Sequence, residues 1–546
     1  MDTFRILLTI KAALAGAVIL WLLFDELCRA RGRKKARVFL AVVLILICGV
    51  AVGAYFDFGR YPKFGRFMNP HDFYHYYLGS KYSREVGYLY LYECVTVATW
   101  ENTGQLKHRG VRRMDDYTYT SGESVVREAE KYRRLFSHER WEAFKKDVGF
   151  FDEQLGRRFV MVTQDMGYNP TPVWNMVARA ITNRVSTRHI GLLVYLDLAL
   201  IALMFFAVWA AFDFRTALLA LAFFCTCFPM SYTHSRGGFL RLDWVMMLVM
   251  AVCALKLERY KTAGGLVAYA AMARVFPLVF AFGLGGKFVW DFLGTRKLSR
   301  KYIEFFATLA LVCLVLAGLS AWADGGLGQW PAFFKKIGLH NSHIAPVRVG
   351  FKYLFLMAHE NPFQSWAPFK SQMIQTFTER RVLWWLIQGV VLLFVLYVVR
   401  NLDDYETIPC CYVPAFFLAA PTFYYHVVTI TALFFFLPKR DQLLRTAGVV
   451  YMFLMSISLF ILNGFLPLHL KLSFIMGCML LGLCLYIMAL ASWVEPGVAG
   501  GGDRDAPGEP PVAHAPRSEA PARKGKRAKG EGDKKRRSTK RRHWSS

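Results

Sequence analysis

Apolar stretches separated by short polar loops recur along the whole chain. Some of these stretches are long enough to cross a bilayer as a helix, and others would cover about half of one. Counting both kinds, the pattern predicts thirteen spans, over residues 5–24, 38–56, 189–211, 216–230, 244–258, 262–275, 277–291, 305–322, 382–399, 410–423, 427–438, 447–464 and 471–493. The sequence therefore predicts an all-α polytopic membrane protein.

The composition agrees with this class and excludes others. Apolar residues make up 55% of the 546 residues and charged residues only 19%, which leaves too little polar surface for a soluble protein of this length. The same figures exclude a collagen, a coiled coil and a wholly disordered chain. Most of the eleven cysteines lie in apolar runs. Because Cys94 alone falls in the long polar segment 57–188, we predict no disulfide within that segment.

Basic residues between the spans predict how the chain is oriented. The net charge is +28, and an excess of Lys and Arg marks the cytoplasmic loops of a membrane protein. The basic clusters fall on one side only if the stretches at 274–277 and 424–426 each turn back as a pair of short spans. Pro277 and Pro421 favour such turns, because proline removes a helix hydrogen-bond donor.

With those two turns the topology closes consistently. We expect a multi-pass protein of the plasma (inner) membrane, with its N-terminus outside the cytoplasm and its C-terminus inside. The loops 57–188, 231–243 and 323–381 are then extracytoplasmic. The long first loop is itself basic, but long loops translocate largely regardless of charge.

The chain divides into three parts on this pattern. Residues 1–37 form an additional N-terminal span with a basic loop, and residues 38–493 form the main transmembrane domain. Within its first loop, helical spacing between residues 122 and 160 predicts two or three amphipathic helices on the membrane surface or over a cavity. The tail 494–546 is rich in Pro, Gly, Ala, Lys and Arg, which predicts disorder. We expect its basic run to contact anionic lipid headgroups, RNA or protein binding being the weaker alternative.

The first candidate for chemistry lies just beyond the second span, in residues 69–77. Asp72 is flanked by aromatic residues at the membrane–water boundary, where a catalytic base for a lipid-borne substrate would lie. An interfacial aromatic belt in which Asp72 caps a helix explains the same residues equally well. His71 and His75 stand one helical turn apart, which would suit a metal, but the sequence shows no third ligand nearby. We therefore predict no metal site.

Two further clusters carry arginines. Arg236, Arg241 and Asp243 fall in the predicted loop 231–243. Arg274 stands inside an otherwise apolar hairpin, where an arginine is costly unless an anion or a cavity holds it. Its planar guanidinium suits a phosphate. An ion pair with a carboxylate such as Asp243 is the alternative.

The last two clusters carry histidines. Residues 340–343 include Asn341 and His343, and residues 424–426 end in His426. A lone histidine is more often structural than catalytic. The predicted topology nevertheless places all five clusters on one side of the membrane, and this convergence indicates a shared functional site.

In their order along the chain, these segments resemble the GT-C membrane glycosyltransferases, specifically the bacterial branch that uses polyprenyl-phosphate-mannose donors. The resemblance covers about residues 38–440. It rests on Asp72-Phe73 followed by Tyr, Asn169 to Pro172, Arg241-Leu-Asp243, Ala-Gly-Gly at 263–265, Ala273 to Pro277, Asn341-Ser342 and Tyr424-Tyr425-His426. Family members commonly carry Gly-Gln-x-Asn where this chain has residues 237–240, and lysine at the position of Arg274.

The resemblance implies a GT-C-like bundle of about thirteen transmembrane helices with a long helical extracytoplasmic first loop. It also implies inverting transfer of mannose or another hexose from a polyprenyl-phosphate donor to an acceptor hydroxyl on a lipid, glycan or protein. Asp72 would be the general base, and Arg274, with Arg236 or Arg241, would bind the donor phosphate. The candidate contacts to acceptor or phosphate are His343, Asn341, His426, Tyr76 and Asp243.

The expected partners are the lipid-linked donor, the acceptor and membrane lipids, with no nucleic acid. No cofactor is required, because the leaving group is already a phosphate, and a divalent metal is optional and not predicted. A transporter or flippase of lipid-linked saccharides would use the same arginines without needing Asp72 as a base. A scaffold that keeps the fold without activity is the third alternative.

Overall fold

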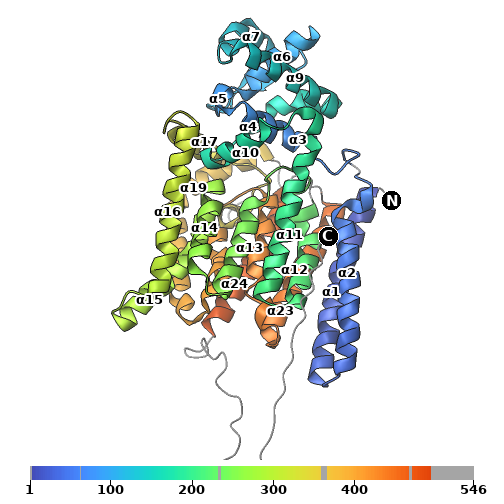
Figure 1. Ribbon diagram of the computed structural model, residues 1–546, viewed down its shortest axis with the longest axis vertical. Coiled ribbons are helices and arrows are strands. Elements are labelled where there is room, and N and C mark those ends of the chain that lie inside the picture. The colour runs from blue at the N-terminus through green and yellow to red at the C-terminus, as the bar shows by residue number, and fades with distance from the viewer. Residues whose placement is uncertain (1–2, 62, 232–234, 358–365, 467–469, 494–546) are drawn as a thin grey trace, which may run out of the picture. The chain divides into compact units, whose positions relative to one another are not determined.

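A computed structural model describes residues 3–61, 63–231, 235–357, 366–466 and 470–493 of the chain. Residues 1–500 form one compact unit, and the tail 494–546 lies outside the described residues. The described part is almost entirely helical (Figure 1). Its two short strands, β1 (Gly110–Arg112) and β2 (Tyr119–Ser121), pair antiparallel.

Helices occupy every range where the apolar pattern predicts a span. Eight helices are long and apolar enough to cross a membrane, by length and composition, in the part of the chain that the structure describes. This confirms an all-α polytopic membrane protein. These eight contain α1 (Thr3–Ala30), α2 (Lys34–Tyr55), α11 (Val194–Ala211), α15 (Phe282–Thr295), α16 (Arg300–Ala323), α19 (Trp366–Val398), α23 (Leu443–Phe465) and α24 (Leu470–Ser492). The helices α11 and α15 reach this length together with the 3₁₀ turns before them, as Thr187–Ala211 and Phe276–Thr295.

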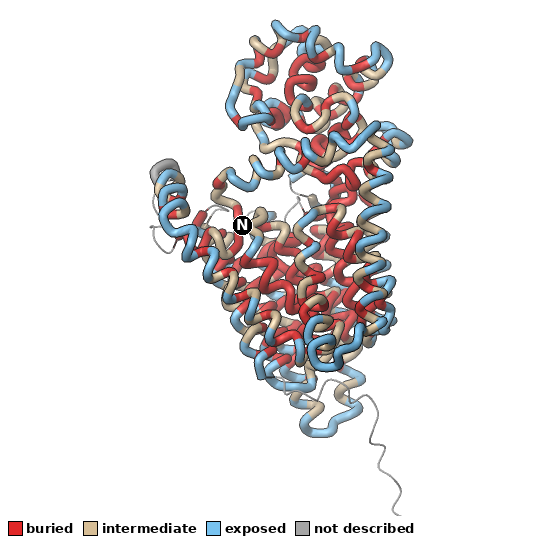
Figure 2. The backbone as a smooth tube through the Cα atoms, turned by 90° about the vertical axis from the view of Figure 1, so that its left-hand side faces the viewer, coloured by how far each residue is buried: buried red, intermediate tan, exposed pale blue. Residues whose placement is uncertain are grey.

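Shorter helices fill the ranges between these long ones. They are α12 (Phe214–Thr226), α13 (Asp243–Lys256), α14 (Tyr260–Arg274), α20 (Thr407–Cys410), α21 (Tyr412–Leu418) and α22 (Thr429–Leu433), with the 3₁₀ turns η6 (Phe276–Ala281), η9 (Phe423–Val428) and η10 (Leu437–Lys439). Most of their residues are buried, whereas in α16 only Tyr302, Phe305 and Ser320 are buried. Figure 2 shows the buried residues concentrated inside the bundle.

Small residues allow close packing between α14 and α16. A Cβ atom on Gly264 would lie 2.3 Å from the backbone oxygen of Phe305, so only glycine fits there. This glycine belongs to the Ala-Gly-Gly run noted in the sequence. The contact fixes α14, which ends at Arg274, against its neighbour.

The helix α1 is joined to the rest of the unit by packing and charge. It packs against α2, α12 and α23. The Lys11 Nζ lies 3.2 Å from Asp57 Oδ1, and both side chains are buried. Asp57 also pairs with Arg236. The N-terminal helix is therefore packed onto the bundle and joined to it by buried charges.

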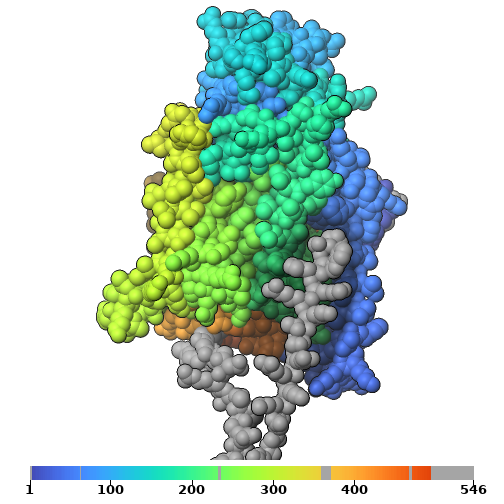
Figure 3. Space-filling view, in the orientation of Figure 1, coloured from blue at the N-terminus to red at the C-terminus, as the bar shows by residue number. Residues whose placement is uncertain are grey.

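Residues 57–188 form a helical cap at one end of the bundle (Figures 1 and 3). It contains α3 (Pro70–Phe73), the π-helical turn η2 (Tyr74–Leu78), α4 (Gly79–Lys81), α5 (Ser83–Val86), α6 (Leu91–Thr103), α7 (Gly122–Arg127), α8 (Ala129–Arg133), α9 (His138–Leu155), the 3₁₀ segment η3 (Gly156–Gln164) and α10 (Pro172–Thr182). The range 122–160 holds α7, α8 and α9, as its helical spacing predicts. The strand pair and the other helices were not predicted.

The apolar face of α9 is covered by protein. Its buried residues include Trp141, Phe144, Val148 and Phe151, which recur at helical spacing. The helix packs against α6. Its amphipathic pattern therefore builds the core of the cap.

The second large loop is shorter than the apolar pattern indicated. The helix α19 begins at Trp366, well before the predicted span at 382–399. The predicted loop 323–381 thus contains α17 (Gln329–Ser342), α18 (Phe351–Met357) and the first turns of α19. The extra turns are amphiphilic, with charged residues at 379–381, which is why a hydropathy pattern leaves them out.

Candidate functional site

Asp72 lies buried at the base of the cap. Pro70 begins α3, and the side chain of Asn69 caps this helix by accepting hydrogen bonds from the backbone N–H groups of His71 and Asp72. Asn69, and not Asp72, is therefore the helix cap. The Asp72 side chain is left to point into the protein, where only 4% of the residue is exposed.

The Asp72 carboxylate has one oxygen near a cation and one without a hydrogen-bond partner. Its Oδ1 lies 3.5 Å from the Arg241 Nε. Its Oδ2 is buried and has no hydrogen-bond partner among the described residues. Burial raises the pKa of Asp72, and the Arg241 guanidinium opposes that rise.

Arg241 is surrounded by tyrosines. Its guanidinium carbon lies 4.5 Å from the ring centre of Tyr76, 5.2 Å from that of Tyr424 and 5.7 Å from that of Tyr425. It also donates a hydrogen bond to the Tyr76 hydroxyl. These contacts bring three of the five clusters noted in the sequence together around Asp72.

Arg274 adds a second buried guanidinium beside the same aromatic residues. Its carbon lies 6.0 Å from the Tyr76 ring centre and 5.4 Å from that of Trp174. Its Nη1 donates to the backbone oxygen of Ala273, but its Nε and Nη2 have no hydrogen-bond partner within the described residues. The next residue, Val275, has a φ of +62°, which is unfavourable for a β-branched residue.

Asp243 does not neutralise Arg274 directly. The Asp243 Oδ2 accepts a hydrogen bond of 2.9 Å from the Tyr269 hydroxyl. No ion pair joins Asp243 to Arg274, although the structure describes both side chains. The ion pair between Arg274 and Asp243, which was the alternative to phosphate binding, is therefore not formed, and two guanidinium donors of Arg274 have no partner among the described residues.

The segment 169–174 ties the cap to the end of α14. Thr171 caps α10, and its hydroxyl donates to the backbone oxygen of Met272 at 2.6 Å. The Trp174 indole N–H donates to the backbone oxygen of Leu240 at 3.0 Å. These bonds place α10 next to Arg274 on one side and next to Arg241 on the other.

Two glycines let the backbone approach Asp72. Gly237 has a φ of +67°, and a Cβ atom there would lie 1.8 Å from the backbone oxygen of Phe67. A Cβ atom on Gly238 would lie 2.8 Å from the Asp72 Oδ2. Any side chain at Gly238 would therefore displace the carboxylate or the loop.

Two of the candidate residues have structural partners elsewhere. Arg236 lies 2.5 Å from the Asp57 Oδ2 and also donates to the backbone oxygen of Tyr55. His426 lies between the Tyr412 hydroxyl and the backbone oxygen of Val349, with 3.1 Å to each. Both side chains are thereby engaged in internal contacts.

Asn341 and His343 lie at the end of α17. Asn341 is exposed, and the His343 ring lies 5.7 Å from that of Tyr117. Burial lowers the pKa of His343. No hydrogen bond or ion pair joins these two residues to Asp72 or Arg274 in the described part of the chain.

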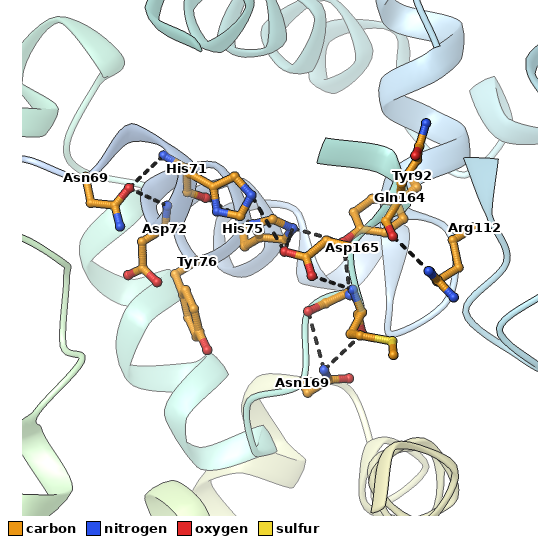
Figure 4. A network of polar contacts seen from close by, with 12 residues as sticks. Asn69, His71, Asp72, His75, Tyr76, Tyr92, Arg112, Gln164, Asp165 and Asn169 are labelled. Atoms are coloured by element: carbon orange, nitrogen blue, oxygen red, sulfur yellow. Dashed lines mark hydrogen bonds and ion pairs between the residues drawn. The ribbon is translucent and has the colours of Figure 1, made fainter. Parts of the chain in front are cut away.

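A cluster of two histidines and one carboxylate lies beside Asp72. The His71 and His75 Nε2 atoms are 3.6 Å and 3.8 Å from the Asp165 Oδ2. Figure 4 shows these side chains pointing toward one another. Burial, together with the neighbouring His75, lowers the pKa of His71 to about 4. The sequence shows no third ligand near the histidines. The fold brings Asp165 next to them, although it lies far from them along the chain.

No protein-family model matches the chain, and neither a curated protein nor a solved structure matches it. What the site can do chemically must therefore come from its own residues. It combines a buried carboxylate oxygen and two buried guanidinium groups, all lined by aromatic rings.

Proposed function

We propose that this protein is a membrane glycosyltransferase that moves a hexose, with mannose as the first expectation, from a polyprenyl-phosphate donor to an acceptor hydroxyl. One observation carries the proposal. A buried carboxylate with an unused oxygen, Asp72, lies beside Arg241 and close to the residues around Arg274, an arginine whose two unused donors are buried. Glycosyl transfer from a lipid phosphate needs these two groups, a base and an anion site.

Asp72 acts as the base in this proposal. Its Oδ2 accepts the proton of the acceptor hydroxyl while the acceptor oxygen attacks the anomeric carbon. The bond from that carbon to the phosphate oxygen breaks, and its electron pair stays on the polyprenyl phosphate. A single displacement of this kind inverts the anomeric configuration.

Arg274 binds the phosphate. The unused Nε and Nη2 donors form one edge of the guanidinium fork, which matches two oxygens of a phosphate. As the bond to the sugar breaks, negative charge grows on those oxygens, and a fixed cation in a buried site stabilises it. Arg241 supports both groups, because it pairs with Asp72 and shares the Tyr76 ring with Arg274.

The proposal includes a GT-C-like bundle of about thirteen spans, with the cap 57–188 outside the cytoplasm. The order of motifs along residues 38–440 supports this fold. The excess of basic residues on alternate loops supports the orientation, with the basic tail on anionic lipid at the cytoplasmic face. The sugar then comes from a lipid carrier, because nucleotide sugars are not supplied on that side of the membrane.

The test is transfer of labelled mannose from polyprenyl phosphate in proteoliposomes that hold the purified protein and an extract of acceptor lipids and glycans. Asp72→Asn should lower the transfer rate by about 10²–10⁴-fold, since general bases contribute about this much. This variant should still bind the donor, which is measured as labelled lipid retained with the protein on a filter. Asp116→Asn, at an exposed carboxylate of the cap, is the matched control and should leave both quantities unchanged.

A lipid-saccharide transporter would give a different pattern. Its arginines would still bind the donor, but Asp72→Asn would not change the movement of labelled lipid between the leaflets. Detecting such movement without any transferred sugar would replace the transferase proposal with a flippase.

A further inference from the structure

We infer that His71, His75 and Asp165 form a binding site for one divalent transition-metal ion, with Zn²⁺ as the best match. One ligand atom from each side chain lies within 4.8 Å of the other two. The histidines belong to consecutive turns, in α3 and η2, and Asp165 directly follows η3. Two imidazole nitrogens and one carboxylate oxygen are a usual ligand set for zinc.

The distances are close to those of an occupied site. Ligands at about 2.0–2.1 Å from a tetrahedral zinc ion lie about 3.3–3.4 Å from one another. The separations from the Asp165 Oδ2 to the two Nε2 atoms are 3.6 Å and 3.8 Å. All three ligand atoms lie within 4.8 Å of one another, so an ion would have to draw them closer together.

Hydrogen bonds hold His75 in the state that a metal needs. Its Nδ1 lies 3.0 Å from the backbone oxygen of His71, and a carbonyl can only accept, so Nδ1 carries the proton. The Nε2 then carries the lone pair, which accepts the Tyr92 hydroxyl at 2.9 Å and lies 3.8 Å from the Asp165 Oδ2. A bound ion would take the place of the Tyr92 proton on this nitrogen. Metal-ligating histidines commonly donate their other N–H to a backbone carbonyl in this way.

Asp165 is also oriented and accessible. Its Oδ1 accepts the backbone N–H of Met166 at 2.7 Å, which leaves Oδ2 toward the histidines. The Asp165 side chain is 45% exposed and that of His71 is 29% exposed, so an ion can enter and a water molecule can take the fourth position. The nitrogen ligands disfavour Mg²⁺ and Ca²⁺, which prefer oxygen.

A bound ion would tie together two segments that carry the candidate site. The histidines flank Asp72 in sequence, while Asp165 leads into the segment that begins α10. Figure 4 shows Asp72 and Tyr76 pointing away from the histidines. The ion would therefore position the helix that carries Asp72 without contacting the proposed substrate. The site rests on its ligands alone and does not depend on sugar transfer.

The experiment uses the purified full-length protein, stripped with a chelator and dialysed against ZnCl₂. Metal analysis should find about one more zinc per chain in the wild type than in His71→Ala or Asp165→Asn. Zinc should raise the melting temperature of the wild type and not of these variants. Cobalt in place of zinc should give the visible absorption of a tetrahedral ion. His189→Ala, at an exposed histidine just after this loop, is the control and should behave as the wild type.

Equal zinc in the wild type and both ligand variants would overturn the site, as would an equal rise in melting temperature with MgCl₂. The two variants change different ligands, and Asp165→Asn conserves the side-chain shape. Metal-free melting curves that match the wild type show that each variant is folded. If the protein binds no zinc but transfers sugar, the metal site is wrong and the proposed function is kept. If it binds zinc but transfers no sugar, the metal site is kept and the proposed function is wrong.

Discussion

Removing the Arg274 guanidinium tests the proposed phosphate site most directly. Two of its donors have no hydrogen-bond partner among the described residues, so in the proposal both are free for the donor phosphate. A hydrogen bond to a charged group contributes about 1.5–3 kcal/mol. Loss of two such bonds amounts to about 3–6 kcal/mol, or about 10²–10⁴-fold in rate. Arg274→Ala should therefore lower transfer by that factor with every acceptor tested.

The same variant should be nearly as stable as the wild type. Arg274→Ala removes one hydrogen bond to Ala273 and two aromatic contacts, but it also removes a buried charge that lacks a salt bridge. A cation–π contact contributes about 0.5–1 kcal/mol. Because unpaired buried charge is costly, we expect a net change below about 2 kcal/mol. Arg274→Lys keeps the charge without the fork and should retain part of the activity.

Arg236→Ala is the matched comparison. Arg236 is a buried arginine that is paired with Asp57, whereas Arg274 is half-buried with buried Nε and Nη2 atoms. Breaking a buried pair costs about 3–5 kcal/mol. Its melting temperature should fall well below that of Arg274→Ala. The assay combines thermal unfolding in detergent with initial rates of mannose transfer and binding of labelled donor. If Arg274→Ala unfolds as early as Arg236→Ala and still binds donor normally, Arg274 is structural and the phosphate site is refuted.

Three further outcomes are expected, two from the structure and one from the charge pattern of the sequence. Gly238→Ala should lower transfer by displacing the Asp72 carboxylate, whereas Gly265→Ala, whose Cβ would meet ordinary contacts of 3.9 Å, should keep full rates; equal rates would contradict the close approach. Burial lowers the pKa of Lys336 to about 7, below about 10.4 in the unfolded chain. The unfolded state then binds more protons between these values, so the melting temperature should rise with pH above about 7, and Lys336→Met should reduce that rise. A reporter fused after Ser546 should be active only in the cytoplasm, and external activity would reverse the proposed orientation.

The apolar pattern predicts most of the helices because burial and lipid both select long runs of apolar residues. It also brings Asp72, Arg241 and Tyr424 to one place, because alternate loops of a membrane protein must lie on the same side. Both predictions use only the order of spans and loops along the chain, and a single sequence shows that order.

The pairing of individual side chains could not be predicted in the same way. Nothing near Arg236 in the sequence indicates that Asp57 binds it, and nothing near His75 indicates Asp165. Such pairs depend on how the cap folds over the bundle, which a hydropathy pattern does not encode. The one local signal was a histidine pair at helical spacing, which predicts a shared face but not its third ligand.

The buried contact between Lys11 and Asp57 has a consequence for how the chain is made. Lys11 is a buried residue of the apolar helix α1, and a lysine in the middle of a lone membrane helix costs about 2.5–3.5 kcal/mol on insertion scales. Its counter-ion follows 46 residues later, at the far end of α2. We therefore expect α1 to be stable in the bilayer only together with α2, so that the two helices insert as a hairpin. Arg236, another 179 residues along, then locks that hairpin to the growing bundle.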